Sequence, residues 1–277
     1  MNQTLERIKD IGIVPVVVIE DPQEAKPVAE ALLAGGISCI EVTYRTDAAE
    51  ESIRTICESF PEMLVGAGTI LTIEQAESAI QAGASFLVSP GTNPNIIKYC
   101  SEKGVLITPG VSSPTDIEMA LSYGIDVVKF FPAEQLGGLP TIKAMSAPYS
   151  TVKFLPTGGI NEDNIASYMS FHKVLACGGS WMVNRSLIKK GDFEKITRLS
   201  HQAVIKMLGL EVTHIGAGIS ITTNHISRAL SFFEKQGFKA DLESATKKGD
   251  VVQGVTLIES ETGSTIQLLQ KEEVIYG

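Results

Sequence analysis

The chain has 277 residues and a formal net charge of −9, with 44% apolar and 20% charged residues. This composition is typical of a globular protein with one large domain, or one large and one small. Basic residues gather no more densely than the pairs Lys189 with Lys190 and Lys247 with Lys248. A nucleic-acid or anionic-membrane partner is therefore not expected, because each needs a basic surface to neutralise phosphates. A small anionic substrate needs only a few local donors.

The N-terminus and the cysteines favour a protein of the reducing cytoplasm. The apolar run at 11–19 is too short to span a bilayer, and no signal-peptide cleavage pattern follows it. The four cysteines show no metal-ligand spacing, and three lie in or beside apolar runs. We therefore expect free thiols and no metal site at Cys39, Cys57, Cys100 and Cys177.

Short β-branched runs alternate with amphipathic stretches between residue 13 and about residue 180. The stretches at 22–36, 72–83 and 113–124 are expected helices, and several start at a Ser, Thr or Asp cap and end on glycine. The runs show little polar alternation, which indicates parallel strands buried on both faces. We expect a short helix at 2–10 and strands at 13–19, 37–44, 63–68, 85–90, 105–110, 126–132, 151–159 and 173–179.

Eight strand–helix units predict a closed (β/α)₈ barrel in the α/β class. The alternative is an open, doubly wound sheet, which fewer units would favour.

The pattern changes after a helix expected at 191–209. We predict a strand at 212–220, a helix at 224–237 and strands at 239–244, 251–260 and 264–272. This β-α-β-β-β order differs from that of the barrel, so two domains are expected, at 1–209 and 210–277. Without a Gly/Ser linker, the second is expected to pack on the barrel or on a neighbouring subunit.

Polar side chains recur at the predicted strand ends, where (β/α)₈ enzymes place reactive groups. Glu41, Thr43 and Arg45 have the same parity, so their side chains share one face. Lys129 lies between two valines and two phenylalanines, where an unpaired ammonium is costly. Lys129 and Glu41 are either a buried structural ion pair, or a nucleophilic amine and the acid/base that serves it. Both interpretations place the two side chains close together.

Two glycine pairs follow the seventh and eighth predicted strands. Gly158 and Gly159 precede a helix start, and a second pair precedes Ser180. Backbone amides beside a helix N-terminus form an anion site, and phosphate sites recur after these two strands in this fold. The glycine pairs therefore predict a phosphate site.

Six motifs occur in order: IEVTYRT (40–46), GAGTIL (66–71), VSPG (88–91), VKFFPAE (128–134), LPTGGI (155–160) and GGSW (178–181). Together, over residues 3–208, they resemble the bacterial 2-keto-3-deoxy-6-phosphogluconate (KDPG) and 4-hydroxy-2-oxoglutarate (KHG) aldolases. The resemblance implies a class I aldolase on a (β/α)₈ barrel, without metal or other cofactor. It also implies a homotrimer and a place in the Entner–Doudoroff pathway.

The resemblance further implies that Lys129 forms a Schiff base and that Glu41 is the general acid/base. Tyr44 stands where many relatives have leucine, and its parity points away from Glu41 and Arg45. The residues implied to bind substrate, from the carboxylate end through the pocket wall to the phosphate end, are Arg45, Thr69, Pro90, Phe131, Thr157, Gly158, Gly159 and Ser180.

Three functions remain open from sequence. The first is cleavage of KDPG, with or without KHG. The second is cleavage of the stereoisomeric phosphogalactonate substrate. The third is non-catalytic binding of a sugar acid, which would leave the buried lysine without a purpose.

Residues 212–244 resemble one module of the vicinal oxygen chelate (glyoxalase-like) fold, in element order, in the His-Ile-Gly opening and in the FFEKQGF helix end. The resemblance implies a metal-ligating histidine on the first strand and a glutamate on the last. His214 fits the first position, but Gln267 stands at the second, so we favour a packing or oligomerisation module without metal.

Overall fold

The computed structural model describes residues 2–215 and 219–271. The chain divides into two compact units, Met1–Val204 and Ile205–Gly277. The division falls inside the long helix α10 (Phe193–Leu208), five residues before the end of the domain predicted at 1–209.

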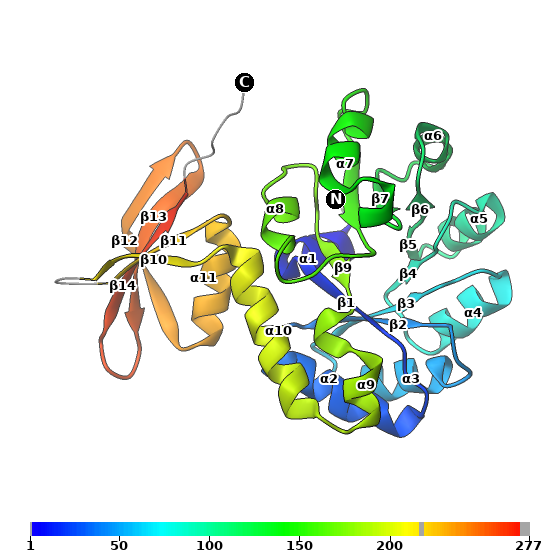
Figure 1. The fold of residues 1–277 in the computed structure, drawn as a ribbon, viewed down its shortest axis with the longest axis horizontal. Helices are drawn as coiled ribbons and strands as arrows, with labels where there is room; N and C mark the ends of the chain where they lie inside the picture. Colours follow the sequence, from blue (N-terminus) through cyan, green and yellow to red (C-terminus); the bar gives the residue numbers. More distant parts are fainter. Residues whose placement is uncertain (1, 216–218, 272–277) are drawn as a thin grey trace. The chain divides into compact units, whose positions relative to one another are not determined.

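The first unit has the predicted (β/α)₈ architecture, with parallel strands and helices in alternation (Figure 1). Six strands form one sheet in the order β5-β4-β3-β2-β1-β9, and three form a second in the order β6-β7-β8. The strands are β1 (Ile13–Val17), β2 (Cys39–Thr43), β3 (Leu64–Gly68), β4 (Phe86–Val88), β5 (Leu106–Thr108), β6 (Gly110–Val111), β7 (Val127–Phe130), β8 (Lys153–Pro156) and β9 (Cys177–Gly179).

Two irregular joints connect these sheets into a ring. Strands β5 and β6 are one predicted strand interrupted at Pro109, which has no N–H to donate to a ladder. The Pro109 carbonyl still accepts a 2.9 Å hydrogen bond from the Lys129 amide of β7. On the other side, single bridges pair Phe154 with Val174 and Thr157 with Gly178.

Local capping chemistry sets several helix starts. Ser113 and Asp116 form a capping box, in which each side chain accepts a hydrogen bond from the other residue's amide. The Thr72 hydroxyl accepts from the Gln75 amide at 3.2 Å. The helices are α1 (Gln3–Ile11), α2 (Ala25–Ala34), α3 (Ala49–Ser59), α4 (Ile73–Gln81), α5 (Pro94–Glu102), α6 (Pro114–Ser122), α7 (Gly138–Ser146), α8 (Ile165–Met169) and α9 (Arg185–Lys189), with 3₁₀ turns η1 (Pro22–Glu24), η2 (Glu134–Leu136) and η3 (Trp181–Val183).

Helix α1 closes the amino-terminal end of the barrel. Its buried Leu5 and Ile8 pack in one cluster with Val14, Cys39 and Leu64, which lie near the starts of β1, β2 and β3. This cluster leaves the carboxyl ends of the strands as the end at which reactive groups gather.

The second unit is a mixed five-stranded sheet in the order β10-β11-β14-β13-β12, with helix α11 beside it (Figure 1). The prediction of one continuous strand at 212–220 is wrong. It consists of two antiparallel strands, and residues 216–218, Gly-Ala-Gly in the sequence, lie outside the described residues. The elements are β10 (Glu211–Ile215), β11 (Ile219–Thr223), α11 (Ile226–Lys235), β12 (Phe238–Lys248), β13 (Val251–Glu259) and β14 (Thr265–Gln270). The last predicted strand, 264–272, ends beyond the described residues.

His214 lies exposed on β10, in register with Ser220, which in turn pairs with Gln267. Ser220 donates a 3.3 Å hydrogen bond to the Gln267 side chain. In residues 2–215 and 219–271, no group of three or more His, Cys, Asp or Glu is arranged to hold a metal. Over the same residues, no helix is long and apolar enough to cross a membrane.

Removing the ring of Phe86 should destabilise the first unit. Phe86 is fully buried on β4, so Phe86→Ala should lower the free energy of unfolding by about 3–5 kcal/mol. The single tryptophan, Trp181, belongs to this unit, so its fluorescence during urea unfolding measures the loss. Met119→Ala, at a side chain 39% exposed, is the control and should change stability by less than about 0.5 kcal/mol. Equal losses in both variants would contradict the packing described above.

Candidate active site

The barrel brings Lys129 of β7 and Glu41 of β2 together. The Lys129 Nζ lies 3.6 Å from Glu41 Oε1, and the two side chains are 6% and 1% exposed. Both backbones are fixed by ladders, since Lys129 pairs with Gly110 and Leu155, and Glu41 pairs with Gly66. The geometry agrees with both interpretations of this pair, so its hydrogen bonding must distinguish them.

The Glu41 carboxylate has space but no hydrogen-bond partner. A Cβ at position 68 would lie 2.0 Å from Oε1, so Gly68 is required for the carboxylate to occupy its place. Within the described residues, neither Glu41 oxygen accepts a hydrogen bond. A purely structural buried ion pair is stable when further hydrogen bonds satisfy its carboxylate, and these are absent here. The arrangement therefore favours a carboxylate that serves a bound molecule.

An aromatic wall lies beside the amine. The Lys129 Nζ is 5.1 Å from the ring centroid of Phe131, within the range of a cation–π interaction. Pro90 follows β4, and its carbonyl lies directly against Gly110, the residue in register with Lys129. Phe131 and Pro90 are both partly buried. The structure thus places both predicted pocket residues around the same strand pair.

Arg45 and Thr69 extend from neighbouring strand ends and contact each other. The Arg45 Nε donates a 3.3 Å hydrogen bond to the Thr69 hydroxyl. Thr69 has a φ of 59°, the one described non-glycine residue with a positive φ. Such a conformation costs on the order of 1–3 kcal/mol and persists where surrounding structure enforces it. An exposed guanidinium beside a fixed hydroxyl is suited to binding a carboxylate in two-point fashion.

The two glycine pairs meet at the ends of β8 and β9. The bridge between Thr157 and Gly178 aligns the two strand ends, so the turn through Gly158 and Gly159 neighbours the residues that lead to Ser180. Gly158 and Gly159 have φ values of 99° and 81°, which L side chains rarely adopt. Ser180 is exposed at the end of β9. This cluster has the backbone amides and hydroxyl that an anion site requires.

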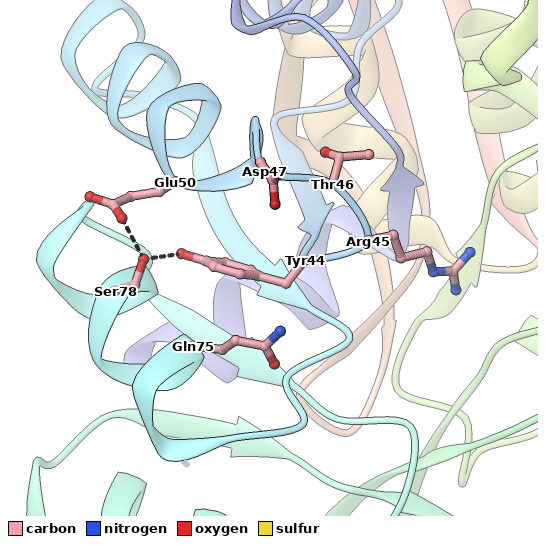
Figure 2. A pocket seen from close by; sticks show the side chains of 7 residues that line it. All are labelled: Tyr44, Arg45, Thr46, Asp47, Glu50, Gln75 and Ser78. Carbon is pink, nitrogen blue, oxygen red and sulfur yellow. Dashed lines mark hydrogen bonds between the residues drawn. The ribbon is translucent and has the colours of Figure 1, made fainter.

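Tyr44 lines a polar pocket of about 380 Å³, and Arg45 is also among its lining residues (Figure 2). Its hydroxyl lies 2.8 Å from the Ser78 hydroxyl, which donates a 2.7 Å hydrogen bond to Glu50. Partial burial raises the pKa of Tyr44. Figure 2 shows Tyr44 and Arg45 on opposite sides of the chain, in line with their predicted parities. The contacts of Tyr44 with Ser78 on α4, and of Ser78 with Glu50 on α3, were not predicted, because the spacing of these residues in the sequence gives no indication that they meet.

Comparisons with known proteins assign this first unit to one family. A family model described as "KDPG and KHG aldolase" matches residues 5–199. The 2-dehydro-3-deoxy-phosphogluconate aldolase of Treponema pallidum is 50% identical over 204 residues, which cover 74% of this chain and 97% of that protein. The KHG/KDPG aldolase of Escherichia coli K12 is 41% identical over 192 residues, covering 69% of this chain and 90% of that protein.

Solved structures agree with the sequence comparisons. The KDPG aldolase of Legionella pneumophila, captured with pyruvate as a covalent carbinolamine intermediate, matches with a TM-score of 0.71 and 38% identity, over 73% of this chain and 98% of that one. A structure described as native KDPGal has a TM-score of 0.64 but 23% identity, which shows a shared fold alone. With a (β/α)₈ barrel, a buried lysine–glutamate pair, a family model that matches residues 5–199 and a relative 50% identical over 204 residues, the chain belongs to the KDPG and KHG aldolase family.

Proposed function

We propose that this protein is a class I aldolase that cleaves KDPG to pyruvate and glyceraldehyde 3-phosphate. The observation that carries the proposal is the buried Lys129 amine, 3.6 Å from a Glu41 carboxylate that accepts no hydrogen bond within the described residues. A protein that only binds a sugar acid gains nothing from this costly pair. The relatives at 41–50% identity carry the same activity in their names.

Arg45 and Thr69 hold the carboxylate of the 2-keto acid. The guanidinium presents two parallel N–H groups to a carboxylate, which a lysine at this position would not match. The hydrogen bond from Arg45 to Thr69 orients the guanidinium before substrate arrives. With the carboxylate fixed, the adjacent C2 ketone is directed to Lys129, between the pocket walls formed by Phe131 and Pro90.

Lys129 is the nucleophile. Once its ammonium has passed a proton to Glu41, the neutral amine attacks the C2 ketone, and the resulting carbinolamine loses water to form an iminium as Glu41 returns that proton to the departing hydroxyl. The positively charged iminium then accepts the electron pair released when the C3–C4 bond breaks. The Lys129 Nζ lies 5.1 Å from the centroid of the Phe131 ring, so a cation–π interaction with this ring stabilises the positive charge of the iminium.

Glu41 moves the protons. Its carboxylate removes the proton of the C4 hydroxyl, directly or through water, as the C3–C4 bond breaks and the aldehyde leaves. The protonated Glu41 then returns a proton to C3 of the enamine. Hydrolysis of the new iminium releases pyruvate and regenerates the Lys129 amine. No step needs a metal, so chelators should leave turnover intact.

The turn at Gly158 and Gly159, with Thr157 beside it and Ser180 opposite, is the proposed phosphate site. A glycine turn beside the glycine-rich end of β9 suits a phosphorylated substrate. KHG, which has no phosphate, is the proposed second substrate, because the relative from Escherichia coli is named for both activities. The phosphogalactonate activity has support only from a structure 23% identical to this chain, so it is the weaker alternative.

We further propose that the enzyme is a homotrimer in the cytoplasm, with residues 1–209 forming the aldolase domain and residues 210–277 an appended module. Four free thiols at Cys39, Cys57, Cys100 and Cys177 support a reducing compartment. Gel filtration with light scattering measures the subunit number directly.

Replacing the nucleophile should abolish turnover. Lys129→Ala should reduce pyruvate release from KDPG to the background rate, because the variant lacks the amine that attacks the C2 ketone. A coupled assay with lactate dehydrogenase measures it. Lys153→Ala is the matched control, since Lys153 lies on neighbouring β8 and donates to the His172 carbonyl at 3.0 Å instead. Near-normal activity of Lys129→Ala would rule out the Schiff-base mechanism.

Neutralising the acid/base should slow chemistry without removing the nucleophile. Glu41→Gln should lower kcat by about 10²–10⁴-fold, the usual contribution of general acid/base catalysis. The surface variant Glu102→Gln, which weakens an exposed ion pair with Lys98 on α5, should keep normal kcat. A Glu41→Gln enzyme with wild-type kcat would show that the carboxylate is structural.

A further inference from the structure

In the turn after β8, the carbonyl groups of two successive residues, Gly158 and Gly159, accept hydrogen bonds. The Gly158 carbonyl accepts a 3.0 Å hydrogen bond from the Glu134 amide, and the Gly159 carbonyl accepts one of 3.0 Å from the Asn164 side chain. In a trans peptide, the C=O and N–H groups point in opposite directions. The N–H groups of Gly159 and Ile160 therefore point away from these partners, and neither has an acceptor within the described residues.

Asn164 holds this turn and does not cap its own helix. It stands directly before α8, but its side chain makes no capping hydrogen bond to that helix. Its Nδ2 donates to the Gly159 carbonyl, and its Oδ1 accepts a 2.9 Å hydrogen bond from the Asn161 amide. The side chain is thus bonded at both ends to the segment that carries the free amides.

Tyr168, four residues after Asn164, supports the same turn through Glu134, the residue that donates to the Gly158 carbonyl. An i, i+4 spacing places both side chains on one face of the helix. Tyr168 is 2% exposed, and its hydroxyl donates to the Glu134 carboxylate. Burial raises the pKa of Tyr168, which keeps this hydroxyl protonated as a donor.

Glu134 links Tyr168 to the turn through its backbone and its side-chain stem. Its amide donates to the Gly158 carbonyl, and its Cγ lies 2.5 Å from the position that a Cβ at residue 159 would occupy. Moving Glu134 would therefore move the Gly158–Gly159 peptide. The Tyr168 hydroxyl also offsets part of the carboxylate charge that would otherwise repel an anion at this turn.

We propose that Asn164 and Tyr168 are positioning residues that hold the amides of Gly159 and Ile160 ready for the substrate phosphate, and so set the preference for phosphorylated over unphosphorylated 2-keto acids. Donors fixed in advance bind an anion more tightly than donors that must reorganise. The inference rests on the proposed function, because it assigns the phosphate of KDPG to this turn.

The test compares two substrates in two variants. Tyr168→Phe and Asn164→Ala should each lower the ratio of kcat/KM for KDPG to kcat/KM for KHG by about tenfold, mainly through the KM for KDPG, as expected when a hydrogen bond to a charged group weakens. Tyr149→Phe is the matched control, since it also removes a tyrosine hydrogen bond to a glutamate, that of Glu118 at 3.2 Å. Its ratio should equal that of wild type.

A second measurement, the affinity for inorganic phosphate, does not depend on substrate cleavage. Titration calorimetry with inorganic phosphate should give a Kd raised about tenfold in both variants and unchanged in Tyr149→Phe. An unchanged ratio and Kd in both variants would overturn the inference, as would equal losses on both substrates with an unchanged phosphate Kd. A protein that cleaves neither substrate but shows the expected phosphate Kd values would contradict the proposed function, while supporting the role of Asn164 and Tyr168 in holding the amides for an anion.

Discussion

The structure of the first unit is organised around one buried ion pair whose carboxylate is left without other partners. An ammonium and a carboxylate 3.6 Å apart, almost free of solvent, are tolerable only if the surrounding fold fixes both. The fold does so from several directions: ladders on both sides hold β2 and β7, Gly68 leaves room for the carboxylate, and the Phe131 ring faces the amine. The same apolar surroundings that make the pair costly strengthen the electrostatic interactions of these two groups with a bound 2-keto acid.

The groups that we propose to bind substrate surround this centre at the strand ends, in an order that matches the proposed substrate. Arg45 and Thr69 follow β2 and β3, Lys129 lies in β7, the Gly158–Gly159 turn follows β8, and Ser180 follows β9. Helix α1 seals the opposite end of the barrel with Leu5 and Ile8. Packing and chemistry are thus separated along the barrel axis, so polar groups can be concentrated at one end without opening the core.

The architecture of the first unit could be predicted from the sequence, because repeated β-branched runs between amphipathic stretches are typical of buried parallel strands. The pairing of Lys129 with Glu41 could also be predicted, because a charged residue inside such a run needs a partner of opposite charge or a catalytic role. It could not locate the break at Pro109 within one expected strand, nor the reversal between β10 and β11, since both depend on tertiary hydrogen bonds. It also missed Asn164 and Tyr168. An asparagine before a helix usually indicates a cap and a tyrosine in an apolar stretch a core residue, and only the contacts with Gly159 and Glu134 show otherwise. The glyoxalase-like resemblance of the second unit stays a prediction, as the family match ends at residue 199.

The most direct test of the Schiff-base assignment is reduction with borohydride in the presence of pyruvate, followed by peptide mass spectrometry. Pyruvate has the carboxylate that we assign to Arg45 and the ketone that we assign to Lys129, and borohydride reduces an iminium between pyruvate and a lysine to a stable secondary amine. The account predicts a reduced pyruvyl adduct on the peptide that contains Lys129, and no adduct in Lys129→Ala. An adduct on another lysine, or none in the wild-type enzyme, would contradict it.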